Sequence, residues 1–170
     1  FGVVANQEHL TELADVAATI ATQGARVDQL ARAVAWLRAG VRLWYKTHAT
    51  AEDLAALVCE HRCPAGVEWQ GFFEESEADE DWVEGDYGHY SAVTRVDPSR
   101  GLITLRDPYP DFWRADRVFR LDWFISRWWD VNLAPAPESG RLRPVEDRRM
   151  LFIIAREHAR FPAALGMTLG

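Results

Sequence analysis

The sequence predicts an α+β fold, in which N-terminal helices are followed by an antiparallel β-sheet. Three observations support this prediction. The first forty residues have helical hydrophobic spacing, residues 89–105 have the pattern of a β-hairpin, and 48% of the 170 residues are hydrophobic. A chain of this length and composition is expected to bury one substantial core. Helices and strands that are segregated along the chain are typical of α+β proteins.

Helices are expected in the first third of the chain. The first has an apolar stripe at helical spacing, made of Leu10, Leu13, Val16 and Ala17. A second stripe covers residues 27–39, and Gly40 follows it as a glycine follows many helices. A short strand is expected over residues 41–45. Thr50 and Asp53 have the spacing of a capping box, which predicts a third helix that runs to about His61.

Strands are expected after Pro64. The strands are predicted at residues 66–73, 89–96 and 102–105, with an acidic loop over residues 74–81. The turn sequence Asp97-Pro98-Ser99-Arg100-Gly101 joins the last two strands into a hairpin. A short aromatic helix is expected over residues 121–129, a linker over 135–140 and a last helix over 146–160.

The net charge of −7 argues against nucleic acid as a partner, because phosphate binding requires clustered Lys and Arg. The acidic run at residues 74–81 is interpreted as a solvated loop, with the binding of basic peptides as the alternative. No apolar run is long enough to span a membrane, and no leader peptide is evident. Cys59 and Cys63 lack a second ligand pair, so neither a metal nor a cofactor is expected. Two cysteines also favour a reducing, cytoplasmic compartment.

His89 and Asp107 are the candidate catalytic residues. His89 begins the first strand of the predicted hairpin, and Asp107 follows the end of the second, so both are expected at the same end of the sheet. A carboxylate there accepts a hydrogen bond from one imidazole nitrogen and leaves the other nitrogen to act as a base. The same spacing also fits a solvent-exposed histidine beside an aspartate that caps the Asp-Pro turn.

The segments that contain these two residues resemble the C39-like peptidases, which are papain-like cysteine peptidases. The similar stretches are Gly88-His89-Tyr90, Ile103-Thr104-Leu105-Arg106-Asp107-Pro108 and the helix that runs from Leu121 to Trp128, within residues 7–130. The resemblance implies a papain-like fold and hydrolysis of peptide or amide bonds, with His89 as general base and Asp107 orienting it. On this resemblance residues 1–133 form a C39-like domain that lacks its nucleophile helix. The residue pattern beyond it predicts a linker at 134–144 and a C-terminal helical extension at 145–170.

The sequence departs from this family at the nucleophile. The Cys-Gly-Pro-like motif and the preceding oxyanion-hole Gln are not in the chain, and Phe1-Gly2-Val3-Val4 is similar to the end of the family's nucleophile helix. The catalytic cysteine is therefore expected upstream of Phe1. Cys59, late in a helix, is predicted to be a small buried hydrophobic residue, and Cys63 to lie in a loop. Gln70 is interpreted as an ordinary strand residue.

The remaining candidates are weaker. His9 and His158 are expected on helices, and His48 and His61 in or beside loops. The tryptophans are expected to pack in the core or in a lid, with a substrate groove as the alternative, and they are Trp113, Trp123, Trp128 and Trp129.

Three functions stay open at this point. The first is a C39-like cysteine peptidase that acts on a peptide or protein substrate. The second is a catalytically inactive module of the same fold, a pseudoenzyme that binds a peptide or protein partner. The third is a structural subunit, in which a partner chain supplies the missing helix.

Overall fold

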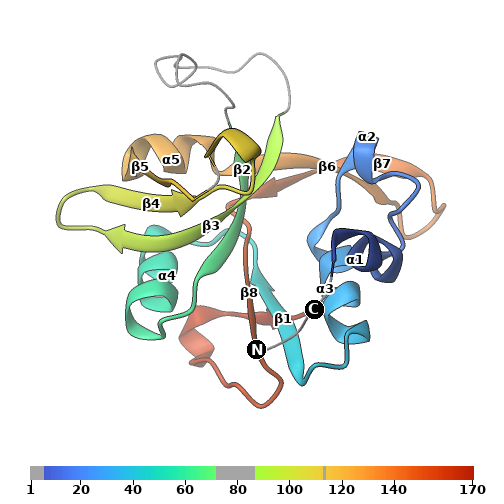
Figure 1. Ribbon diagram of the computed structural model, residues 1–170, viewed down its shortest axis with the longest axis horizontal. Helices are drawn as coiled ribbons and strands as arrows, with labels where there is room; N and C mark the ends of the chain where they lie inside the picture. The colour runs from blue at the N-terminus through green and yellow to red at the C-terminus, as the bar shows by residue number, and fades with distance from the viewer. Residues whose placement is uncertain (1–5, 72–86, 113) are drawn as a thin grey trace. The chain divides into compact units, whose positions relative to one another are not determined.

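The computed structural model describes residues 6–71, 87–112 and 114–170, and it has a mixed α+β fold with mostly antiparallel strands (Figure 1). The predicted α+β class is confirmed. The chain forms two compact units. In the described residues, one unit contains 6–46 and 152–170, and the other contains 47–151.

The first unit contains most of the helices of the N-terminal third. Its helices are α1 (Gln7–Ala14), α2 (Ile20–Gln23) and α3 (Val27–Trp36), and its strands are β1 (Val41–Lys46), β8 (Leu151–Arg156) and β9 (Thr168–Leu169). The strands have the order β8-β1-β9, and β1 pairs antiparallel with β9. One core cluster joins α3 to β1 through Ala31, Val34, Val41 and Leu43. Burying such aliphatic side chains is the main stabilising contribution in a small unit.

The two predicted N-terminal helices are present, with shifted ends. The Asn6 side chain accepts a hydrogen bond of 2.8 Å from the His9 N–H and begins α1. Asp15, with φ of 61°, ends the helix in the left-handed region. Val16 is buried although it lies beyond the helix, so its apolar side chain packs from the turn instead. The predicted strand at 41–45 is also present, as β1.

The second unit contains the predicted hairpin. Its elements are α4 (Ala51–Ala55), a π-helical turn (Ala56–Glu60), β2 (Ala65–Gln70), β3 (Gly88–Asp97), β4 (Leu102–Arg106), β5 (Asp116–Arg120), α5 (Leu121–Arg127), β6 (Trp129–Pro135) and β7 (Leu142–Arg148). Strands β5, β4, β3 and β2 lie side by side and are antiparallel (Figure 1). Strands β6 and β7 form a separate two-stranded hairpin.

Local sequence signals explain several of these elements. Thr50 and Asp53 form the predicted capping box, in which each side chain accepts a hydrogen bond from the other residue's N–H. The turn at Asp97–Gly101 joins β3 and β4, and Gly101 has the positive φ of 63° that a glycine adopts without strain. The core beside this hairpin is aromatic, because Trp69 packs against Phe119 and against Phe124 of α5.

The C-terminal prediction was wrong. Residues 146–160 form β7 and β8 instead of a helix, and the expected helical extension is therefore absent from the described residues. In β8 every second residue is buried, namely Leu151, Ile153 and Ala155, and this period of two is that of a strand. The predicted linker at 135–140 is the turn of the β6–β7 hairpin.

Other differences are smaller. The aromatic helix ends at Arg127 and not at Trp129, and β5 and β6 were not predicted. The predicted strand at 66–73 is observed as β2 over 65–70. The acidic run at 74–81, the segment Phe1-Gly2-Val3-Val4 and Trp113 lie outside the described residues.

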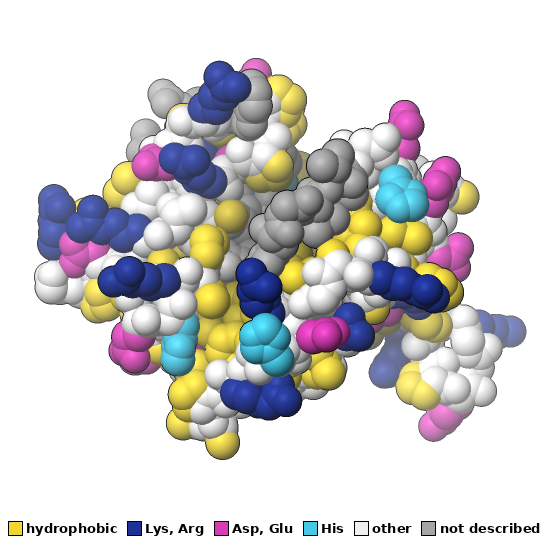
Figure 2. Space-filling view, turned by 60° about the horizontal axis from the view of Figure 1, so that its bottom comes forward, with side chains coloured by type: hydrophobic (Ala, Val, Ile, Leu, Met, Phe, Trp, Pro, Cys, Tyr) yellow, Lys and Arg dark blue, Asp and Glu magenta, His cyan; other side chains and the backbone are white. Residues whose placement is uncertain are grey.

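The longest helix in the described part of the chain, α3, has 10 residues, and none there has the length and apolar character to cross a lipid bilayer. On the face shown in Figure 2, basic and acidic side chains are interspersed with apolar and uncharged ones.

Candidate active site

The pairing of β2, β3, β4 and β5 brings four polar side chains to one face of the sheet. Directly opposed residues in an antiparallel pair share a face, and faces alternate along each strand. On β3, Val93 is opposite Leu105 of β4, which is opposite Arg117 of β5. His89 and Ser91 share the face of Val93, and Asp107 lies two residues beyond Leu105. The register therefore directs all four polar groups toward one place.

His89 and Asp107 are in contact there. The Nε2 atom of His89 lies 2.8 Å from Oδ1 of Asp107, as expected from their places on the hairpin. The Asp107 side chain is 1% exposed and the His89 side chain 14% exposed, so the pair is shielded from water, and the imidazole is the more accessible of the two. Since the bond uses Nε2, the ring nitrogen that can act on another group is Nδ1.

The carboxylate of Asp107 accepts hydrogen bonds at both oxygens. Besides His89, its Oδ1 accepts the Tyr109 backbone N–H at 2.9 Å. Its Oδ2 accepts from Ser91 Oγ at 3.3 Å and from Arg117 Nη1 at 2.8 Å. The Ser91 hydroxyl in turn accepts from the Trp69 indole N–H at 3.0 Å. A buried carboxylate with four donors is held in one orientation.

These contacts decide the charge state of Asp107. Burial on its own raises the pKa of this carboxyl group, because it disfavours the charged form. The hydrogen bonds from His89 and Tyr109, with the charges of His89 and Arg117, have the opposite and larger effect. The net result is a pKa of Asp107 below its ordinary value, so the group is a carboxylate at neutral pH.

The Arg117 guanidinium is itself fixed in place. Its side chain is 9% exposed, and its Cζ lies 3.7 Å from the centre of the Phe112 ring and 5.2 Å from that of Phe119. Arginine can stack on aromatic rings in this way while its N–H groups, which lie in the plane of the guanidinium, donate to a carboxylate. Sequence reasoning missed Arg117 because β5 itself was missed: the segment Asp116-Arg117-Val118-Phe119-Arg120 lacks the polar–apolar alternation of a strand, and the signal that it offers is the β-branched and aromatic pair Val118-Phe119.

The imidazole also packs tightly against the end of β2. A Cβ atom on Gly71 would lie 2.9 Å from the Cβ of His89 and 3.1 Å from its Cδ2, which is too close for a real contact. Glycine at this position therefore lets the backbone approach the ring. The histidine is held between Gly71 and Asp107.

A second polar cluster joins β2 and β3 to the β6–β7 hairpin. Glu68 and Gln70 alternate with Trp69 on β2, so their side chains lie on the other face of the sheet. Asn132 Nδ2 donates to Glu68 Oε1 at 3.0 Å and to Asp147 at 3.1 Å. Burial raises the pKa of Glu68, and the hydrogen bonds from its neighbours only partly offset this effect.

Gln70 belongs to the same cluster. Its Nε2 donates to the Trp129 carbonyl at 3.3 Å and to Asp130 Oδ1 at 3.2 Å, and its Oε1 accepts the Tyr87 N–H at 2.7 Å. The side chain is 1% exposed. These bonds connect β2 to β6, so Gln70 is a buried residue of a strand, as its sequence position predicts.

Neither cysteine of the chain lies beside His89. The Cys59 thiol donates to the Val96 carbonyl at 3.4 Å, and Val96 is seven residues from His89 along β3, or roughly 24 Å at about 3.4 Å per residue. Cys59 is exposed, so the prediction that it is buried was wrong; the short π-helical turn leaves it at the surface. Cys63 precedes β2, and its thiol donates to the carbonyl of His61.

His48 follows β1 and His61 follows the π-helical turn, so both lie in connecting segments, as expected. His9 lies on α1, beside Glu12 at 3.9 Å. The expected helical position of His158 was wrong, because this residue lies in the turn after β8. Across residues 6–71, 87–112 and 114–170, no three His, Cys, Asp or Glu residues form a cluster suited to a metal ion.

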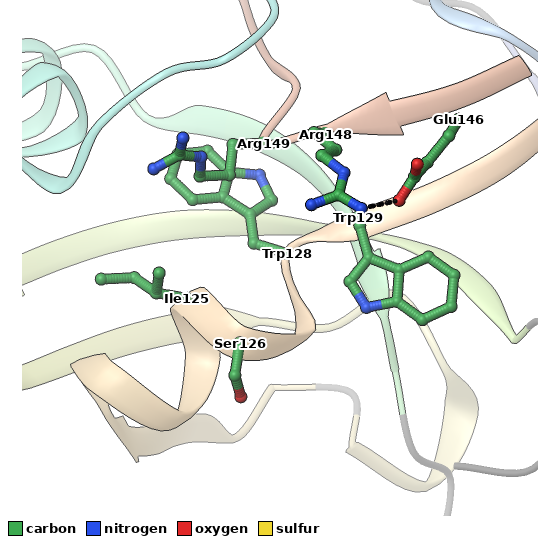
Figure 3. Close-up of a pocket in the computed structure, with 7 residues that line it drawn as sticks. All are labelled: Ile125, Ser126, Trp128, Trp129, Glu146, Arg148 and Arg149. Carbon is green, nitrogen blue, oxygen red and sulfur yellow. Dashed lines mark ion pairs between the residues drawn. The ribbon is translucent and has the colours of Figure 1, made fainter. Parts of the chain in front are cut away.

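Trp123 and Trp128 pack against other aromatic side chains, and both Trp128 and Trp129 line a hollow. Trp123 contacts Trp69, and Trp128 is buried with its indole N–H donating to the Met150 carbonyl at 2.8 Å. Trp129 lies at a hollow of about 510 Å³ with Arg149 and with the ion pair of Arg148 and Glu146 (Figure 3). This hollow does not include His89 or Asp107 in its lining.

The chain matches no protein-family model and no curated protein sequence.

Proposed function

We propose that this chain carries the histidine–aspartate part of a papain-like cysteine peptidase of the C39 type. The observation that supports the proposal is the 2.8 Å contact between His89 Nε2 and a buried, fully hydrogen-bonded Asp107 carboxylate. An imidazole that is oriented in this way by a carboxylate is the base of nucleophilic hydrolases on several unrelated folds. In the proposal the nucleophilic cysteine precedes Phe1 in the full-length protein.

The proposed reaction has two stages. First, Nδ1 of His89 takes the thiol proton, and the sulfur forms a bond to the substrate carbonyl carbon while the C=O electron pair moves to oxygen. Backbone N–H groups and an upstream Gln stabilise that oxyanion. The C–N bond then breaks as the imidazolium protonates the leaving amine. Second, water loses a proton to His89, attacks the thioester and releases the acid and the thiol.

Asp107 has two effects in this scheme. Its Oδ1 accepts a hydrogen bond from the Nε2–H group, which leaves Nδ1 as the basic nitrogen that faces the thiol in the proposal. Its negative charge stabilises the imidazolium that forms in both stages. Gly71 contributes by shape, because any side chain at this position pushes against the ring.

The alternative is a pseudoenzyme that uses the same fold to bind a peptide or protein. It is favoured by one observation, that both cysteines of this chain lie away from His89: Cys59 contacts Val96 near the other end of β3, and Cys63 precedes the end of β2 that pairs with Val93. A structural subunit completed by a partner chain is the third possibility.

One experiment distinguishes these functions. The protein is expressed from its natural start codon and treated with a thiol-directed electrophile, and the modified cysteine is identified by mass spectrometry. The peptidase proposal predicts fast modification of one cysteine upstream of Phe1. His89→Ala is expected to slow this modification at least tenfold, whereas His48→Ala, a change at an exposed loop histidine, leaves it unchanged. Equal labelling in wild type and His89→Ala, or the lack of an upstream cysteine, contradicts the proposal.

A further inference from the structure

The Oδ2 atom of Asp107 is paired with an arginine side chain, which a histidine–aspartate pair does not itself require. Arg117 Nη1 lies 2.8 Å from Oδ2, on the opposite carboxylate oxygen from the one that contacts His89. The two side chains are 9% and 1% exposed, so their interaction is shielded from solvent. Buried arginine–carboxylate pairs interact strongly because water does not screen them.

A second arginine–aspartate pair between the same two strands shows that this burial is particular to Arg117. Arg106 of β4 and Asp116 of β5 pair at 2.9 Å, but their side chains are 62% and 55% exposed. The guanidinium of Arg117 instead stacks on the Phe112 ring, with Cζ 3.7 Å from the ring centre. Beside the β4–β5 pairing, a solvated ion pair thus lies next to a buried pair that shares its carboxylate with His89.

We propose that Arg117 is a positioning residue, which fixes Oδ2 of Asp107 and balances part of its charge, so that a proton on the His89 imidazole is held less tightly than it would be beside an unbalanced carboxylate. The proposal deepens the peptidase function and rests on it. An unbalanced buried carboxylate draws a proton onto a neighbouring imidazole, since an opposite charge favours the charged form. A guanidinium on the other oxygen reduces that attraction and also repels a charge on the imidazole.

Other charged groups near His89 come from three neighbouring elements. Asp107 follows β4, and Asp130 of β6 lies beside Gly88, where a Cβ would be 2.1 Å from its Oδ1. Arg127 of α5 donates from Nε to the carbonyl of Gln70. Asp107 contacts His89 at 2.8 Å, and Arg117 donates a hydrogen bond to that aspartate.

The test is an NMR titration of the His89 imidazole in this chain, assigned with His89→Gln. Arg117→Met removes the charge and the hydrogen bond, Arg117→Gln removes the charge but keeps an N–H donor, and Arg117→Lys keeps the charge. We expect the titration midpoint to rise by about one pH unit in the Met and Gln variants and to stay near the wild-type value in the Lys variant. Arg106→Met, which changes the net charge equally at the exposed pair, is the control and leaves the midpoint unchanged.

The outcomes are separable. An unshifted midpoint in folded Arg117→Gln overturns the charge-balance role, and an equal shift in Arg106→Met assigns the effect to net charge and overturns it as well. If Arg117→Met does not fold, the Gln and Lys variants still decide the question. The titration needs no nucleophile, so failure of the peptidase proposal in the labelling experiment and failure of the Arg117 proposal are recognised independently.

Discussion

Replacing Asp107 by Asn tests how strongly the site depends on this carboxylate. The amide has the shape of the carboxylate, but one of its two ends becomes a donor. In one orientation of the amide, its NH₂ group faces the donors His89 and Tyr109, and in the other it faces the donors Ser91 and Arg117. In both orientations a donor meets donors. Removing one partner of a buried ion pair leaves the other charge uncompensated, at a cost of about 3–5 kcal/mol. We therefore expect Asp107→Asn to lower the free energy of unfolding by that amount.

The matched control is Asp116→Asn, which breaks the solvated pair with Arg106 on the same two strands. Exposed pairs contribute about 0–1 kcal/mol, so this variant is expected to be nearly as stable as wild type. Both variants are compared by denaturant unfolding at pH 7, with the free energy extrapolated to water. If Asp107→Asn is within about 1 kcal/mol of Asp116→Asn, the buried pair is not the strong interaction inferred from its geometry.

Three further predictions concern the same unit. The pKa of Asp107 is lowered from 3.8, so the stabilisation by this carboxylate is present above that pH and is lost as the pH falls below it. The difference in unfolding free energy between wild type and Asp107→Asn should therefore become smaller in acid denaturation. A difference that becomes larger contradicts this prediction. Burial raises the pKa of Glu68 above 4.5, so the unfolding free energy of the wild type should decrease as the pH rises from 4.5 through the raised pKa. Glu68→Gln should lack this decrease when denaturation is measured across pH. The same pH dependence in both proteins contradicts a raised pKa of Glu68. Gly88→Ala places a Cβ 2.1 Å from Asp130 Oδ1 and should cost about 1–3 kcal/mol in thermal or denaturant unfolding, whereas a neutral result means that the β3–β6 contact is looser than described.

The hairpin that carries His89 and Asp107 was predictable because its signals are local. The turn at 97–101 and the alternation on both sides of it set the register, and the register sets which side chains meet. Position alone left a solvent-exposed histidine as an alternative. The structure places Nε2 of His89 against a buried carboxylate instead.

Features that depend on distant pairing were not predictable from local pattern. Met150, Ile153 and Ile154 have a spacing that fits a helix, and only the burial of Leu151 and Ile153 in β8 shows the strand period. Asn132 meets Glu68 across 64 positions of sequence. Contacts of this kind follow from sheet topology, which residue spacing does not encode.

The tautomer of His89 tests the central claim most directly. Long-range proton–nitrogen NMR correlation on the imidazole of this chain at neutral pH distinguishes a proton on Nε2 from one on Nδ1. The account predicts that neutral His89 carries its proton on Nε2, donates it to Asp107, and presents a basic Nδ1. A neutral ring that carries its proton on Nδ1 instead contradicts the proposed orientation of the base.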